Sequence, residues 1–227
     1  MIAVVIPAHN EAELVGACLA SVQAAAMAPQ LHGEQVMVVV VADSCLDRTE
    51  CIAHALGATV LRVHFQNVGQ ARAAGAALAL QAQARWLAFT DADTVVAQDW
   101  LAEQLRQQAD AVCGTVQVVD WQNYGERMRA HYALTYEDRD GHRHIHGANL
   151  GVCALAYQRA GGFPPLRSSE DVALVNALIS NGATVAWSAA PRVVTSARRN
   201  FRAPDGFGAT LLRVDALAAR SGKTAPC

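Results

Sequence analysis

Two aspartates stand one residue apart in the stretch FTDADT, which directly follows the apolar run RWLA. Side chains at positions i and i+2 of a strand point to the same face, so Asp91 and Asp93 converge if this run is the end of a strand. Two carboxylates at such a distance require a cation, a shared proton or water between them. The pair alone leaves these three alternatives open.

A second pair of carboxylates, Glu170 and Asp171, stands in the stretch SSED before the apolar segment VALVNALISNG. A serine at this point predicts a helix N-cap, and the helix dipole favours acidic residues in the first turn. A carboxylate here could also act as a general base that removes the proton of a hydroxyl. By itself the pattern favours an ordinary helix start. Its spacing after GANLGV and a glycine stop favours a base, with Asp171 preferred over Glu170.

Three further groups of residues could serve a site, but each has a simpler explanation. Arg198 and Arg199 could clamp a diphosphate through bidentate contacts, although exposed arginines are usually only solvated. The stretch HRHIH could place its histidines on one side of a strand, but no fourth metal ligand is apparent, so a polar strand is preferred. Aromatic side chains could stack on a ligand or be buried against a helix: Trp121, Tyr124, Tyr132 and Tyr136.

The elements that must position these residues alternate between strands and helices in the first half of the chain. Aliphatic and β-branched runs predict strands at residues 2–7, 36–42, 59–63 and 86–90, with helices between them. Asn10 with Glu13, and Asp47 with Glu50, predict helix starts. This order predicts βαβ units and a parallel sheet, whose ligands bind beyond the carboxyl ends of the strands. Asn10, Asp43 and the two aspartates of FTDADT follow such ends.

The second half is less regular, and composition sets broad limits. We expect a helix at 100–108, a strand at 111–119 and an insertion or mobile loop at 120–146. With 227 residues, of which 52% are hydrophobic, the chain suits one domain. A net charge of −2 gives no general attraction to nucleic acid. Without a leader pattern or an apolar run of membrane-spanning length, we expect a cytoplasmic protein with reduced cysteines.

Four stretches, in order, resemble a family 2 type glycosyltransferase of the GT-A fold. They are VVIPAHNEA, VVVVADSCLD in the place of the family's V-V-D-D-G-S-x-D, the DAD of FTDADT, and GANLGVCALAYQRAGGFPPLRSSEDVAL. The resemblance implies an α/β fold with a Rossmann-like, mixed but mostly parallel sheet and helices on both faces, in a single domain of residues 1–227. Residues 1–110 would form the nucleotide-sugar-binding half, and residues 111–227 the acceptor and catalytic half.

The resemblance also implies roles for individual residues. Asp93 would bind Mg2+ or Mn2+, while Asp91 would contact the ribose or the metal shell. Asp171 would be the base, and Glu170 would orient the acceptor. The other donor contacts implied are Pro7, Ala8, Asn10 and Glu11 around the nucleoside, Asp43 to the base, and Arg72, Arg198 and Arg199 at the diphosphate.

The implied activity is that of a metal-dependent, inverting, hexosyltransferase-like enzyme. It would move a sugar from a UDP- or GDP-sugar to a hydroxyl of an unknown acceptor, with peripheral membrane contact left open. The sequence departs from the family at Ala42 and Ser44, where an aspartate and a glycine are usual, and at Thr195 and Ser196, where several members carry a histidine.

Two other functions are compatible with parts of the sequence. A nucleotidyltransferase acting on sugar phosphates would carry a glycine-rich loop after the first strand, and PAHNEA does not resemble one. A nucleotide-sugar-binding protein without catalysis agrees with the departures at Ala42 and Thr195 but leaves the intact DAD and SSED unexplained.

Overall fold

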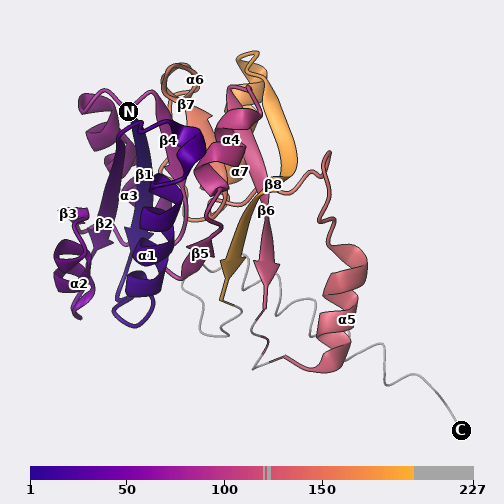
Figure 1. Cartoon of the computed structure of the whole chain (residues 1–227), viewed down its shortest axis with the longest axis horizontal. Helices are drawn as coiled ribbons and strands as arrows, with labels where there is room; N and C mark the ends of the chain where they lie inside the picture. Colours follow the sequence, from indigo (N-terminus) through magenta and orange to yellow (C-terminus); the bar gives the residue numbers. More distant parts are fainter. Residues whose placement is uncertain (120, 122–123, 197–227) are drawn as a thin grey trace, which may run out of the picture.

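The computed structural model describes residues 1–119, 121 and 124–196, and within them one curled sheet runs through the molecule (Figure 1). The strands lie in the order β3-β2-β1-β4-β7-β6-β8-β5. Their bounds are β1 (Ile2–Ala8), β2 (Val36–Asp43), β3 (Thr59–Val63), β4 (Trp86–Phe89), β5 (Thr94–Val96), β6 (Ala111–Val118), β7 (Leu150–Cys153) and β8 (Val185–Thr195). The pairs β1·β2, β1·β4, β2·β3 and β6·β8 are parallel, and the short β5 and β7 run antiparallel to their neighbours.

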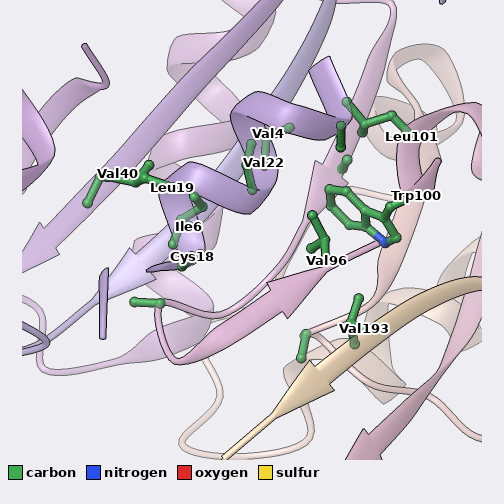
Figure 2. Close-up of a cluster of buried hydrophobic side chains, with 14 of the residues drawn as sticks. Val4, Ile6, Cys18, Leu19, Val22, Val40, Val96, Trp100, Leu101 and Val193 are labelled. Atoms are coloured by element: carbon green, nitrogen blue, oxygen red, sulfur yellow. The ribbon is translucent and has the colours of Figure 1, made fainter. Parts of the chain in front are cut away.

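Helices cover both faces of the sheet, as the alternation of strands and helices predicts. The described helices are α1 (Val15–Ala26), α2 (Thr49–Ala55), α3 (Val68–Gln81), α4 (Trp100–Arg106), α5 (Glu126–Thr135), α6 (Ala154–Arg159) and α7 (Glu170–Ser180), with a 3-10 turn at Pro29–Leu31. Successive residues of β1 face opposite sides, so Ile6 packs with α1, α2 and α4, while Val5 packs with α3, α6 and α7. Figure 2 shows part of the first of these cores, to which Val96, Trp100, Leu101 and Val193 contribute side chains together with Cys18, Leu19 and Val22 of α1. The predicted mixed, mostly parallel α/β sheet is confirmed.

Small residues let α3 approach the sheet closely. A Cβ atom on Gly75 would lie 2.4 Å from Val5 Cγ1 and 2.7 Å from Val41 Cγ2. No larger residue fits there without moving the helix. The close packing fixes the start of α3 near the carboxyl ends of β1 and β2.

The helix start predicted at Asn10 is wrong, whereas the serine N-cap predicted for the SSED segment is confirmed in position. Helix α1 begins at Val15 with Leu14 as its N-cap, and Asn10 has a left-handed φ of 55° instead of capping a helix. Ser169 is the N-cap of α7, but it makes no side-chain capping bond and has a φ of 61°. In both places the tertiary contacts of the neighbouring loops replace local capping as the determinant of the backbone.

The described residues of segment 120–146 form helix α5 and a stretch after it that is hydrogen-bonded to the edge of β6. Beyond its short pairing with β7, one edge of β6 is satisfied by side chains instead of a strand. Tyr136 Oη accepts a hydrogen bond from the Val116 N–H at 2.8 Å, and Tyr132 Oη donates one to the Val116 carbonyl at 2.9 Å. Asp138 then accepts from Thr115 Oγ1 at 2.8 Å. The tyrosines are therefore part of the sheet edge.

Asn149 is the polar residue that ties the centre of this region together. It is 1% exposed, its Oδ1 accepts from Trp100 Nε1 at 2.9 Å, and its Nδ2 donates to the carbonyls of Thr115 (2.7 Å) and Pro191 (2.8 Å). These carbonyls flank an irregularity in the β6·β8 register after Gly114. Each of the three bonds satisfies a group that water cannot reach.

We predict that Asn149→Leu lowers the free energy of unfolding by about 3 kcal/mol, because the isosteric side chain leaves buried donors and acceptors unpaired. Urea denaturation measures the change. Asn176→Leu, at an exposed position of α7, is the matched control. If both variants unfold at the same urea concentration, the central role of Asn149 is wrong.

No helix in the described ranges combines the length and the apolar character that crossing a membrane requires.

Candidate active site

The loops that follow β1 and β2 are joined into one unit at the carboxyl edge of the sheet. His9 Nδ1 donates to the carbonyl of Asp43 at 2.6 Å, and Asn10 Oδ1 accepts from the Leu46 N–H at 2.7 Å. The Glu11 N–H donates to Thr49 Oγ1 at 2.7 Å, while Glu11 itself is 6% exposed. Pro7 and Ala8 form the end of β1 beneath these bonds. The residues predicted to border a nucleoside are therefore held together, and His9, which was not predicted, belongs to the same group.

Asp43 stabilises the loop that leads into α3. Its carboxylate accepts from the backbone N–H groups of Phe65 (2.7 Å), Gln66 (2.9 Å) and Asn67 (3.0 Å). Burial raises the pKa of Asp43, but these hydrogen bonds outweigh it and lower the pKa below its ordinary value. Asp43 is thus an anion whose oxygens already hold its own chain. Its predicted contact with a base remains a prediction.

Ser44 explains one departure of this chain from the glycosyltransferase pattern. Its φ is 55°, in the left-handed region where glycine pays no steric penalty. The glycine that is usual at this position therefore serves the backbone turn. Here the Ser44 hydroxyl donates to Asp43 Oδ1 at 3.1 Å, so the turn is kept with a different residue.

Arg72 lies between both predicted carboxylate pairs. Its Nη1 pairs with Glu170 Oε1, and its Nη2 donates to Asp91 Oδ1 at 2.6 Å. The arginine side chain is 5% exposed and Glu170 is 6% exposed, whereas Asp91 is 35% exposed. Burial lowers the pKa of Arg72, but the charges of Asp91, Glu170 and Asp171 outweigh it and raise the pKa. Burial also raises the pKa of Glu170, against the attraction of Arg72.

Asp93 lies at the turn between β4 and β5, beside the end of β8. Its Oδ1 lies 3.4 Å from Thr94 Oγ1 and 3.5 Å from Thr195 Oγ1. The two threonine hydroxyls are themselves 2.9 Å apart. The Thr195 position, where several family members carry a histidine, therefore does lie next to Asp93.

Asp171 is the second residue of α7, directly after the Glu170 that pairs with Arg72. Its Oδ2 accepts from the Gly147 N–H at 2.8 Å, and its Oδ1 accepts from the Val172 N–H at 2.8 Å. A Cβ atom on Gly147 would lie 2.5 Å from Arg72 Cζ. Gly147 was not predicted as a site residue, since its contacts join segments that lie far apart in the sequence.

The histidines of HRHIH stack in the structure instead of converging on a point. The rings of Tyr136 and His144 are parallel within 4°, with centroids 4.1 Å apart, and His146 Nε2 lies 3.0 Å from Tyr136 Oη. Burial, assisted by the charges of His144 and His142, lowers the pKa of His146 to about 3, so its ring is neutral. Among the described residues, no three His, Cys, Asp or Glu side chains gather in a way that could hold a metal ion. Arg198 and Arg199, predicted at the diphosphate, lie outside the described residues.

A mostly parallel sheet with clustered carboxylates at its carboxyl edge is the architecture of the nucleotide-sugar transferases with the GT-A fold. The model of the family "Glycosyl transferase family 2" matches residues 3–160, so the chain belongs to this family. The predicted family and fold are both confirmed.

Solved structures of low sequence identity share this fold. S. aureus TarS (residues 1–349) in complex with UDP-GlcNAc superimposes with a TM-score of 0.69 at 16% identity, covering 96% of this chain and 66% of that one. The mannosyltransferase PcManGT from Pyrobaculum calidifontis, in complex with GDP-Man and Mn2+, gives a TM-score of 0.66 at 18% identity, covering 100% and 76%. The chain thus spans just under two thirds of the TarS fragment. None of the curated protein sequences matches it.

Proposed function

We propose that the protein is a metal-dependent, inverting glycosyltransferase that moves a sugar from a nucleoside-diphosphate sugar to an acceptor hydroxyl. The observation that carries the proposal is the gathering of Asp91 and Asp171 around buried Arg72, with Asp93 at the adjoining turn. In this proposal Asp91 and Asp93 would serve the donor, and Asp171 would serve the acceptor. UDP-GlcNAc in TarS and GDP-Man in PcManGT support a nucleotide-sugar donor of the hexosyl type.

The donor set around Asp93 fits a hard divalent cation. Asp93 and Asp91 are partly exposed carboxylates, and the Thr195 hydroxyl adds a third oxygen close by. Mg2+ and Mn2+ bind through one or two carboxylates while keeping waters and substrate phosphates as the other ligands. Asp93, with Asp91 in its shell, would hold the ion. A bound ion would neutralise the nucleoside diphosphate as it leaves.

The chain's own residues would divide the remaining work. The joined loops of Asn10, Glu11 and Asp43 would border the nucleoside, with Pro7 and Ala8 beneath them. Asp171 would accept the proton of the acceptor hydroxyl while that oxygen attacks the sugar carbon from the side opposite the leaving group, which inverts the centre. We propose residues 1–110 as the donor half and 111–227 as the acceptor half. Arg198 and Arg199 are proposed to clamp the diphosphate.

A thermal-shift screen tests the donor class. We expect UDP or GDP, or their sugars, to raise the melting temperature only with Mn2+ or Mg2+ present. Ligand at one hundred times its Kd adds about 2.7 kcal/mol of stability, or a rise of roughly 5 °C for a chain of this size. Product detection with the stabilising sugar nucleotide then separates an enzyme from a protein that only binds. Stabilisation by nucleoside triphosphate and sugar phosphate, with no effect of sugar nucleotides, would favour a nucleotidyltransferase.

A further inference from the structure

Arg72 uses its two terminal nitrogens on two carboxylates that come from different parts of the chain. Asp91 follows β4, whereas Glu170 opens α7 and lies 98 residues from Arg72. Arg72 Nε has no hydrogen-bond partner among the described residues. A buried guanidinium with an unpaired N–H carries a desolvation cost, so the two ion pairs of Arg72 are weak evidence that it stabilises the folded protein. Its forked geometry is suited to fixing the relative positions of two partners.

The surroundings of Arg72 leave the guanidinium little freedom. Phe163 lies against it, with 5.9 Å between the ring centroid and Cζ. Gly147 lies on it so closely that any Cβ there would overlap the guanidinium. A Cβ on Gly69, at the start of α3, would lie 2.8 Å from the Pro164 carbonyl and 3.0 Å from Glu170 Cβ. Backbone packs against both ends of the Arg72–Glu170 pair.

The same contacts lead to Asp171. The backbone of Gly147 packs against the Arg72 guanidinium, and its N–H donates to Asp171 Oδ2 at 2.8 Å. Glu170, the neighbour of Asp171 in sequence, is fixed by Arg72 directly. A movement of the guanidinium would therefore displace Asp91 on the donor side and Asp171 on the acceptor side together.

We propose that Arg72 is a positioning residue that sets Asp91 and Asp171 relative to each other, with Glu170 as its buried counter-ion. The inference rests on the proposed function for the meaning of the two aspartates, but its geometry is independent of any ligand. It assigns Glu170 to Arg72 instead of to the acceptor. This positioning role also differs from a direct contact of Arg72 with the diphosphate, because any single positive charge at that position could make the direct contact.

Arg72→Lys separates the two roles of Arg72, because lysine keeps the charge and binds phosphate as a point charge but lacks the planar fork that holds two carboxylates in a fixed relative position. Titration calorimetry with UDP and MnCl2, and with GDP and MnCl2, measures the affinity of wild type, Arg72→Lys and Arg72→Met. We expect both variants to bind about tenfold more weakly or worse, by similar factors, as is usual for the loss of a group that orients a ligand carboxylate. Arg62→Lys, in an exposed pair with Glu50, is the control that keeps wild-type affinity. Binding by Arg72→Lys at the wild-type level would overturn the proposal.

Side-chain NMR of the ligand-free protein gives a readout that does not depend on the function. A guanidinium held at both terminal nitrogens rotates slowly and shows separately resolved Hη signals. We expect this signature for Arg72 in wild type and its loss in Glu170→Gln and in Asp91→Asn, both isosteric changes. The Gly147 amide signal should move in Glu170→Gln as well. Free rotation in wild type would overturn the link, even if nucleotides bind. If no nucleotide binds while the signature is present, the proposed function fails and the link stands.

Discussion

Asp93→Ala is expected to lower metal-dependent release of nucleoside diphosphate from the sugar nucleotide by about 10³-fold or more, because charge stabilisation by a bound cation contributes several kcal/mol. Asp93 is the carboxylate at the β4–β5 turn whose Oδ1 lies beside the hydroxyls of Thr94 and Thr195. Removing it leaves Asp91, which Arg72 already engages, as the other carboxylate of the DAD stretch. Initial rates with the donor found by the thermal-shift screen, measured over a range of Mn2+ concentrations, check the prediction.

Two further variants separate loss of charge from loss of packing. Asp93→Asn keeps the size of the side chain and an oxygen toward Thr195, yet should lose nearly as much activity as the alanine variant. Asp99→Ala removes an exposed carboxylate outside the site and should turn over like wild type. Metal-dependent turnover of Asp93→Ala at the wild-type rate would contradict the assignment of Asp93 as a ligand.

The first half of the fold could be predicted because its signals are local. The valine run that becomes β2 and the small residues of α3 identify a doubly covered parallel sheet without knowledge of distant contacts. The second half depends on long-range pairing. Strand β5 has only three residues and pairs with the far end of β8, and β6 completes its edge with tyrosine side chains. Such short or side-chain-satisfied edges leave no periodic pattern to read.

The candidate site likewise has one part that the sequence predicts and another part that depends on long-range contacts. Polar residues at strand ends mark the rim, because the strand ends of a parallel sheet share one edge. The ion pair of Arg72 with Glu170 and the contact of Gly147 with Arg72 join residues that no spacing rule relates. Asp43 is a case in which the sequence suggested one role and the structure shows another. Its type and place suggested a ligand contact, whereas its hydrogen bonds to residues 65–67 show a structural task that the sequence did not indicate.

Asp171→Asn is expected to lower turnover by about 10²- to 10⁴-fold, the usual contribution of a general base, while changing the Kd of the donor by no more than about twofold. Asp171 Oδ2 is oriented by the Gly147 N–H and Oδ1 by the Val172 N–H, so the carboxylate is held at a fixed position. Asparagine keeps the volume and one accepting oxygen but cannot take up a proton. Calorimetry for donor binding and initial rates for turnover measure the two quantities separately, with Asp99→Asn as the matched exposed control.

The split between binding and turnover is what distinguishes Asp171 from the residues around it. Arg72 pairs with both Asp91 and Glu170, so under the proposed positioning role its variants should weaken nucleotide binding and turnover together. Within the described part of the chain, the Asp171 carboxylate accepts hydrogen bonds only from the N–H groups of Gly147 and Val172, so its variant should affect turnover alone. If Asp171→Asn loses donor binding but turns over normally per bound donor, the carboxylate belongs to the donor site. The proton would then have to be removed by another group.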